Sequence, residues 1–251
     1  MSGTLYLIPN RISPTAGSGS LAPDSIAAAR SCRRFLAENA RSARAFLKSI
    51  SHPLPIAELE IIEIGHDPDL SLLTAWLEPV AAGADTAIVS ESGCPAVADP
   101  GAVIVARAEA MGIRVRPMIG PCSILLTLMA SGMNGQRFRF LGYLPIDNSD
   151  RTQALRELEA ASRLGETQLF IETPYRNNRL LESMTDVFSA STRITVAVDV
   201  TGQEESIRTK TARQWKELLG TLPKLPTVFA VLAEPSASKS PHRSAARSAL
   251  N

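Results

Sequence analysis

The chain has 251 residues, and its 26 basic and 25 acidic side chains leave a formal net charge of only +1. This length can bury the core of one large or two small domains. We expect no membrane span, because a spanning helix requires about 18 consecutive apolar residues and no run of that length occurs. We also expect no secretory leader, because the N-terminus lacks a basic segment.

Apolar runs and helical patterns alternate along the first half of the chain. Residues 9–22 are rich in Pro, Gly and Ser, which indicates a loop. The predicted strands are 5–8, 33–37, 59–63, 85–89 and 114–119, and the predicted helices are 24–29, 42–50, 70–82 and 102–111.

The second half continues the alternation with closer strand spacing. Its predicted helices are 124–129, 153–164 (capped by residues 148–150), 177–188 and 215–219, and its predicted strands are 138–143, 168–171, 194–198, 205–209 and 226–232. Residues 236–251 carry no apolar pattern, so we expect a disordered tail.

This alternation predicts an α/β fold in two domains. We place an N-terminal αβ domain at 1–119 and a C-terminal αβ domain at 120–235, with the tail at 236–251. The closer strand spacing of the second domain favours a mixed sheet over a fully parallel one.

Two loops of small residues are the most informative features of the sequence. Residues 90–101 follow a buried strand and precede a helix, with Gly93, Cys94 and Pro95 at their centre. A similar loop, 119–123, follows the next strand. Strand, tight loop and helix in this order expose backbone groups at the carboxyl end of a sheet, so the sequence predicts a ligand held by main chain.

Two other sequence patterns are weaker indications of a binding site. The spacing Gly17-x-Gly19-x-x-Ala22 matches a permissive dinucleotide fingerprint, but it lies well past the first strand, so a loop is favoured. Glu172 and Arg176 follow a predicted strand end, and we favour a site pair there over a simple loop salt bridge.

Basic side chains concentrate between residues 30 and 48, where Glu38 is the only acid. This basic block could attract an anionic partner such as nucleic acid, or it could be the solvated side of a helix, and the sequence leaves both open. Its members are Arg30, Arg33, Arg34, Arg41, Arg44 and Lys48.

The three cysteines lie far apart and are odd in number, which favours a reducing, cytoplasmic environment without a disulfide framework. The three histidines lie in unrelated segments without cysteine partners at ligand spacing, so we expect solvated loop histidines and no metal site.

Four blocks in order resemble the tetrapyrrole-methylase superfamily of S-adenosylmethionine-dependent methyltransferases, nearest its 16S ribosomal RNA cytidine 2′-O-methyltransferase branch. The resemblance covers most of residues 4–234. The blocks are Val-Ser-Glu-Ser-Gly-Cys-Pro-Ala-Val-Ala-Asp-Pro-Gly at 89–101, Gly-Pro-Cys-Ser at 120–123, Phe-x-Phe-x-Gly-Tyr-Leu-Pro at 138–145 and Glu-Thr-Pro-Tyr-Arg at 172–176.

The resemblance implies two αβα domains, a cleft between them for S-adenosylmethionine, and a homodimer. It also implies that backbone holds the methyl donor. The residues it assigns to the donor are Gly93, Cys94, Pro95, Ser123, Ile124, Ile171, Ala197 and Val228.

The chain departs from the branch on the acceptor side. Its residues 37–41, Ala-Glu-Asn-Ala-Arg, keep the Glu and Arg of the branch motif Ala-Glu-Asp-Thr-Arg and lose its Asp and Thr. A ribose hydroxyl needs a base or a hydrogen-bond acceptor, for which Glu38 is the first candidate and Glu172 the second. Arg41 and Arg176 would bind an anionic acceptor.

Two rival functions remain open at this point. The acceptor could be a tetrapyrrole or another small molecule in place of RNA, since an acidic substrate would suit the same basic block. The chain could also be a non-catalytic dimer that only binds the donor, given its altered acceptor motifs.

Overall fold

The computed structural model describes residues 2–218 and 220–235. The described residues form two compact units. Those up to Leu126 together with Asp199–Ser206 make the first unit, and Thr127–Val198 with those from Ile207 onward make the second. This division differs from the predicted boundary at 119/120, because helix α5 (Ser123–Ser131) carries the chain from one unit to the next and a later segment returns to the first.

The first unit contains a parallel sheet of five strands in the order β3-β2-β4-β1-β5. Ala37 pairs with both Glu63 and Val89, so the carboxyl ends of neighbouring strands lie level with each other. The strands are β1 (Thr4–Ile8), β2 (Arg34–Ala37), β3 (Glu60–Glu63), β4 (Thr86–Val89) and β5 (Arg114–Pro117).

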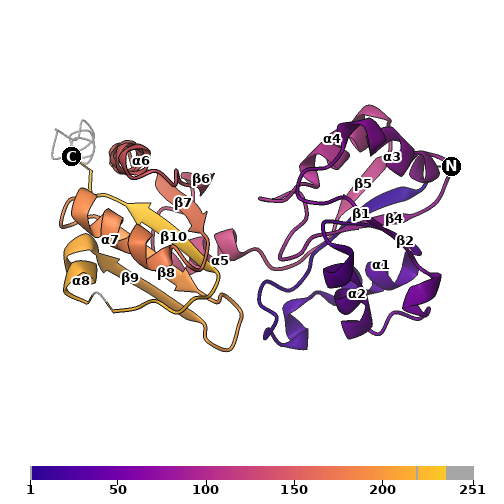
Figure 1. The fold of residues 1–251 in the computed structure, drawn as a ribbon, viewed down its shortest axis with the longest axis horizontal. Coiled ribbons are helices and arrows are strands. Elements are labelled where there is room, and N and C mark those ends of the chain that lie inside the picture. The colour runs from indigo at the N-terminus through magenta and orange to yellow at the C-terminus, as the bar shows by residue number, and fades with distance from the viewer. Residues whose placement is uncertain (1, 219, 236–251) are drawn as a thin grey trace, which may run out of the picture. The chain divides into compact units, whose positions relative to one another are not determined.

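Helices cover both faces of this sheet, with α1 and α2 on one side and α3 and α4 on the other (Figure 1). Two apolar clusters result, one around Phe35 and Leu47 and the other around Leu36 and Leu77. Successive strand residues point to opposite faces, which is why Phe35 and Leu36 enter different clusters. The helices are α1 (Pro23–Ser31), α2 (Ala40–Ser49), α3 (Leu73–Ala81) and α4 (Ala102–Ala110).

Local capping moves two predicted helix starts. Helix α2 begins two residues earlier than expected, because the Asn39 side chain accepts the N–H groups of Arg41 and Ser42 at 2.9 and 3.0 Å. The predicted helix 70–82 divides into the 3-10 turn η3 (Leu70–Leu72) and α3. The glycine-rich segment forms a 3-10 turn, η1 (Ser18–Ser20), and a third such turn is η2 (Ile56–Glu58).

The second unit has a mixed sheet in the order β6-β7-β10-β8-β9, as its strand spacing predicted. Strand β6 runs parallel to β7, whereas β10 is antiparallel to both β7 and β8. The strands are β6 (Phe138–Tyr143), β7 (Thr167–Glu172), β8 (Arg193–Val198), β9 (Ser206–Thr211) and β10 (Thr227–Leu232). The α/β class is confirmed in both units.

The second core is built around stacked Phe170 and Phe229, whose ring centroids are 5.7 Å apart. Helices α6 (Asn148–Ser162), α7 (Asn177–Val187) and α8 (Ala212–Glu217) contribute to it. Two predicted starts were wrong here. Asp147 caps α6 by accepting the N–H groups of residues 149 and 150, and a Thr211 capping box starts α8 three residues early.

The predicted tail 236–251 lies outside the described residues. Among the helices that the structure describes, none is long and apolar enough to cross a membrane.

Candidate functional site

The loops with the candidate functional residues lie at the carboxyl edge of the first unit's sheet. Because β3, β2 and β4 are adjacent and parallel, the segments that follow them leave the sheet side by side. Loops at this edge are the usual place for ligands in open α/β sheets. The segments after these strands bring His66, Glu38 and Glu91 together, and the loop after β4 continues into Gly93.

The Gly93 loop is fixed by hydrogen bonds to its own carbonyl group. The N–H of Asn10 and the hydroxyl of Ser90 each donate to the Gly93 oxygen at 2.9 Å. Gly93 has a φ of +70°, a conformation that favours glycine, and a Cβ there would lie 3.4 Å from the Pro121 oxygen. The two small-residue loops of the first unit therefore meet through backbone.

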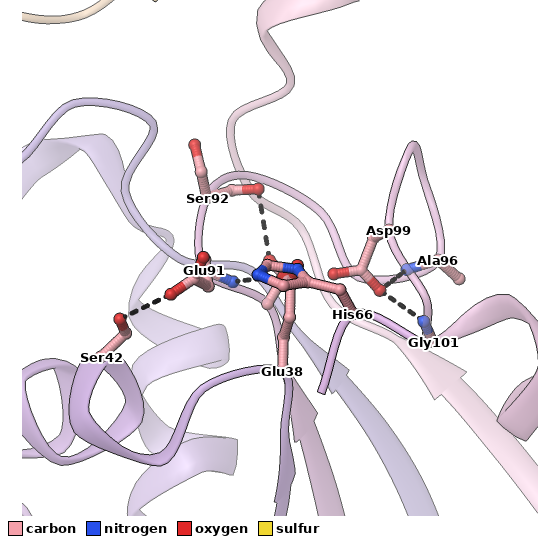
Figure 2. A network of polar contacts seen from close by, with 9 residues as sticks. Glu38, Ser42, His66, Glu91, Ser92, Ala96, Asp99 and Gly101 are labelled. Atoms are coloured by element: carbon pink, nitrogen blue, oxygen red, sulfur yellow. Dashed lines mark hydrogen bonds and ion pairs between the residues drawn. The ribbon is translucent and has the colours of Figure 1, made fainter. Parts of the chain in front are cut away.

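Asp99 organises the far side of the same loop, as Figure 2 shows. One of its carboxylate oxygens accepts the N–H groups of Ala96 at 2.9 Å and Gly101 at 2.7 Å. Between these contacts Ala96 and Ala98 have φ values of 64° and 54°, which are unfavourable for residues with a Cβ. Backbone strain of this kind persists only where surrounding contacts, here those of Asp99, hold the conformation. It is common at binding sites. Asp99 was not among the predicted site residues, although its Asp-Pro-Gly turn is visible in the sequence.

The second small-residue loop packs closely on the end of β1. A Cβ on Gly120 would lie only 2.2 Å from the Pro9 Cβ, so this position requires glycine. Cys94 approaches the loop as well, with its sulfur 3.4 Å from the Pro121 oxygen. The thiols of Cys94 and Cys122 also interact, which lowers the pKa of Cys122 to about 6 and raises that of Cys94.

The start of α5 faces this sulfur pair. The N–H groups of Ile124 and Leu125 point toward the Cys122 sulfur and help to lower its pKa. Ser123 begins the helix, and Ile124 is 7% exposed. The sequence placed Ser123 and Ile124 at the site and gave no role to Cys122.

In the second unit, three residues from distant parts of the sequence are neighbours. Val228 on β10 pairs with Ile171 on β7 and with Ala197 on β8. Ala197 and Val228 are buried, and Ile171 is half-buried. The structure thus brings together the three positions of the second unit that the resemblance assigned to the donor.

A cluster of three side chains stands at the sheet edge in the first unit (Figure 2). Glu38, His66 and Glu91 each offer a ligand or proton-accepting atom, and these atoms lie within 4.8 Å of one another. The Nδ1 of His66 lies 2.6 Å from Glu38 Oε1, and the N–H of Glu91 donates to Glu38 Oε2 at 3.3 Å. The sequence pointed to Glu38 alone, because the strand order that joins the other two to it has no local signal.

Residues 16–215 match the model of one protein family, described as Tetrapyrrole (Corrin/Porphyrin) Methylases. The match spans well over half of the chain. The chain belongs to this family. Its members are S-adenosylmethionine-dependent methyltransferases, so the resemblance drawn from the four sequence blocks is confirmed.

The chain is similar to the Ribosomal RNA small subunit methyltransferase I of Pseudomonas aeruginosa, with 35% identity over 53% of this chain and 46% of the relative. A protein of the same name in Bacillus subtilis is 31% identical over 82% of this chain and 67% of its own length. The chain therefore spans about half the length of the first relative. The crystal structure of the methyltransferase CobJ shares the fold, with a TM-score of 0.58, 20% identity and 95% of each chain covered.

The assigned donor residues of this tetrapyrrole-methylase family member fit a ligand that is held by main chain. Gly93 presents backbone without a side chain, and its anchored carbonyl fixes the loop. In the second unit, Ala197 and Val228 pair on neighbouring strands, and both are buried.

The other predicted base, Glu172, has a partner of its own. Arg176 donates to Glu172 Oε1 from Nε at 2.9 Å and from Nη2 at 2.7 Å, and the Glu172 side chain is 3% exposed. This pair is the i,i+4 contact that spans the turn between β7 and α7. The structure gives both side chains a structural partner, and their assignments to catalysis and acceptor binding stay predictions.

The basic block separates into one structural arginine and several exposed ones. Arg34 is buried, donates to the Trp76 carbonyl at 2.6 Å and pairs with Glu60 at 3.1 Å. Its inclusion among the residues that could meet an acceptor was therefore wrong. Arg41, Arg44 and Lys48 are exposed along α2, at the spacing of one helix face.

Proposed function

We propose that this protein transfers a methyl group from S-adenosylmethionine to small-subunit ribosomal RNA, at a ribose 2′-hydroxyl. The observation that carries the proposal is the pair of backbone loops at the carboxyl edge of the first unit, with a proton-accepting cluster beside them. Family membership and the names of the bacterial relatives support it.

The methyl donor would be held by the backbone of the first unit's two small-residue loops. The residues that we propose for it there are Gly93, Cys94, Pro95, Ser123 and Ile124. In the second unit, Ile171, Ala197 and Val228 are the proposed donor-binding positions. The sulfonium of the bound donor supplies an activated methyl group, so the protein has to orient the acceptor and exclude water.

The acceptor would approach the exposed basic face of α2. Arg41 lies in the first turn of that helix, and its neighbour Ser42 donates its hydroxyl to Glu91 Oε1 at 2.9 Å. The basic face and the Glu38 cluster are therefore adjacent. An RNA phosphate at Arg41 would bring a nearby ribose toward the cluster, because phosphate contacts fix the register of a nucleic acid.

We also propose a homodimer in the cytoplasm. The edge strand β6 exposes Phe138 at 41% and Tyr143 at 60%, and α5 exposes Met129 at 78%. Exposed apolar side chains on an edge strand favour association with a second surface. Ribosomal RNA as the acceptor would place the protein in the cytoplasm.

The test uses the purified protein, radiolabelled S-adenosylmethionine, and two acceptors in parallel: small-subunit ribosomal RNA and a small-molecule extract. The proposal expects label in RNA and its release as a 2′-O-methyl nucleoside after digestion. Label in a small molecule alone would indicate a small-molecule methylase. Donor binding without transfer to either acceptor would indicate a non-catalytic protein.

A further inference from the structure

Glu38 and His66 form a pair whose two members differ sharply in exposure. The Glu38 side chain is 14% exposed and that of His66 is 79% exposed. Both oxygens of Glu38 already have donors within the protein, His66 Nδ1 at 2.6 Å and the Glu91 N–H at 3.3 Å (Figure 2). Glu38 is therefore poorly placed to take a proton from a substrate, whereas the outer face of the His66 ring is open to solvent.

The carboxylate fixes which nitrogen of His66 carries the proton. A neutral imidazole that donates from Nδ1 to a carboxylate has its lone pair on Nε2. This is the arrangement of a base oriented by a second group. An ion pair with one exposed partner contributes little to folding stability. The short distance between His66 and Glu38 is therefore better explained by a functional role than by stabilisation of the fold.

The surroundings of the pair point to the methyl-transfer site. Glu91 lies two residues before Gly93, and Asn10 connects the two by donating its side-chain amide to the Glu91 carbonyl at 3.1 Å and its N–H to the Gly93 carbonyl at 2.9 Å. The side chain of Glu91 accepts a hydrogen bond from the hydroxyl of Ser42 on α2. The pair thus lies between the donor loop and the basic face.

We propose that His66 is the general base of methyl transfer and that Glu38 is its positioning residue. The proposal rests on the function proposed above. The acceptor hydroxyl gives its proton to Nε2 of His66 as its oxygen forms a bond to the methyl carbon. The bond between that carbon and the donor sulfur breaks, the sulfur keeps the electron pair as a neutral thioether, and the imidazolium then returns its proton to water.

The test compares His66→Ala, Glu38→Gln and the control Asp67→Ala, which removes an exposed charge from the same loop. Transfer to RNA should fall by about 100-fold or more in His66→Ala, the usual contribution of a general base. Added imidazole should restore part of that rate, because the exposed position of residue 66 lets it reach the acceptor hydroxyl and take the proton. Binding of S-adenosylhomocysteine, measured by calorimetry, should match that of the parent in all three variants.

Glu38→Gln should lower the turnover number more than it changes the KM for RNA, since it disturbs the orientation of His66 and leaves the acceptor surface intact. Imidazole should not rescue it. An unchanged rate in His66→Ala, or a lost rate that imidazole does not restore, would overturn the assignment of His66. A parent rate that is abolished by a chelator and restored by a divalent cation would overturn it as well, in favour of a cation site at Glu38, His66 and Glu91.

A second measurement needs no acceptor. Nitrogen-15 NMR of the histidine side chains should show His66 as the Nδ1–H tautomer in the parent and a mixture in Glu38→Gln. If the parent methylated no RNA yet kept this tautomer, the proposed function would fail while the oriented base remained. A mixed tautomer in an active parent would refute the positioning role of Glu38.

Discussion

The sulfur of Cys94 lies 3.4 Å from the carbonyl oxygen of Pro121, and this contact joins the two small-residue loops of the first unit. The Cys94 and Cys122 thiols also interact, and the Cys122 sulfur faces the first N–H groups of α5. Both the interaction with Cys94 and the helix N-terminus lower the pKa of Cys122 and so favour its thiolate.

Cys122 should therefore react with iodoacetamide at unusually low pH. Its pKa of about 6 predicts that the thiolate, which is the reactive form, accumulates as the pH rises through that value. An ordinary cysteine ionises only at a pH of about 8.5. Peptide mapping by mass spectrometry after timed alkylation at several pH values measures this. Cys94→Ala removes the interaction that lowers the pKa of Cys122 most and should move the midpoint upward.

Cys32 is the internal control for that experiment. Burial raises its pKa to about 12, and the residue is 1% exposed, so it should stay unmodified in the folded protein throughout. A Cys122 midpoint near that of a free cysteine would show that the two thiols do not interact as described.

Gly93→Val should abolish donor binding. The substitution puts a branched side chain at a φ of +70°, which strains the loop, and the added side chain would occupy space beside the Pro121 oxygen that the donor would need. Gly112→Val is the matched control, because Gly112 has a φ of +67° and a Cβ at that position would have nothing within 4 Å. Both variants should lose about 1–2 kcal/mol of folding free energy through backbone strain.

Calorimetry with S-adenosylhomocysteine separates the two glycine variants. Gly112→Val should bind as the parent does and Gly93→Val should not bind. Equal affinity in both would remove the Gly93 loop from the donor site.

Arg34→Met should destabilise the fold, in contrast to the same change at its exposed neighbour Arg33. Removing the guanidinium leaves the Trp76 carbonyl without its 2.6 Å donor in a buried position. A hydrogen bond from a charged donor contributes about 1.5–3 kcal/mol, whereas an exposed substitution usually changes stability by less than about 0.5 kcal/mol. Urea unfolding of the two variants measures the difference, and equal midpoints would contradict the structural role of Arg34.

Local sequence patterns were sufficient to predict most elements and the two small-residue loops of the first unit. A small-residue loop that directly follows a buried strand has few alternative conformations, so the sequence alone indicates that Gly93 and Ser123 lie on such loops. Alternation of apolar runs likewise indicated the strands to which Ile171, Ala197 and Val228 belong. These three residues are neighbours because β10 lies between β7 and β8. No local sequence pattern predicts that strand order.

The acceptor side could not be predicted for the same reason. Glu38, His66 and Glu91 are separated by 28 and 25 residues, and they meet because β2 pairs with β3 and β4 in parallel register. Charge counting along the chain also could not separate Arg34 from Arg41, because burial depends on which face of the sheet or helix each side chain occupies.

The exposed basic face of α2 leads to the last prediction. Arg41→Glu with Arg44→Glu should weaken RNA binding, since both guanidinium groups project from the same side of the helix as Lys48. Each phosphate contact that is lost should lower the slope of log affinity against log salt by about 1. Donor binding should not change, because the reversed charges lie outside the Gly93 loop.

The control is Arg156→Glu with Arg213→Glu, which makes the same change in net charge at exposed positions of the second unit. Filter binding of small-subunit RNA across a salt series should show a reduced slope in the α2 variant and the parent slope in the control. If both double variants lost affinity equally, RNA would be responding to overall charge, and if neither lost it, the face of α2 would be only a solvated surface. A selective loss would instead place the acceptor beside Glu38 and His66, where the first turn of α2 is tied to Glu91 by Ser42.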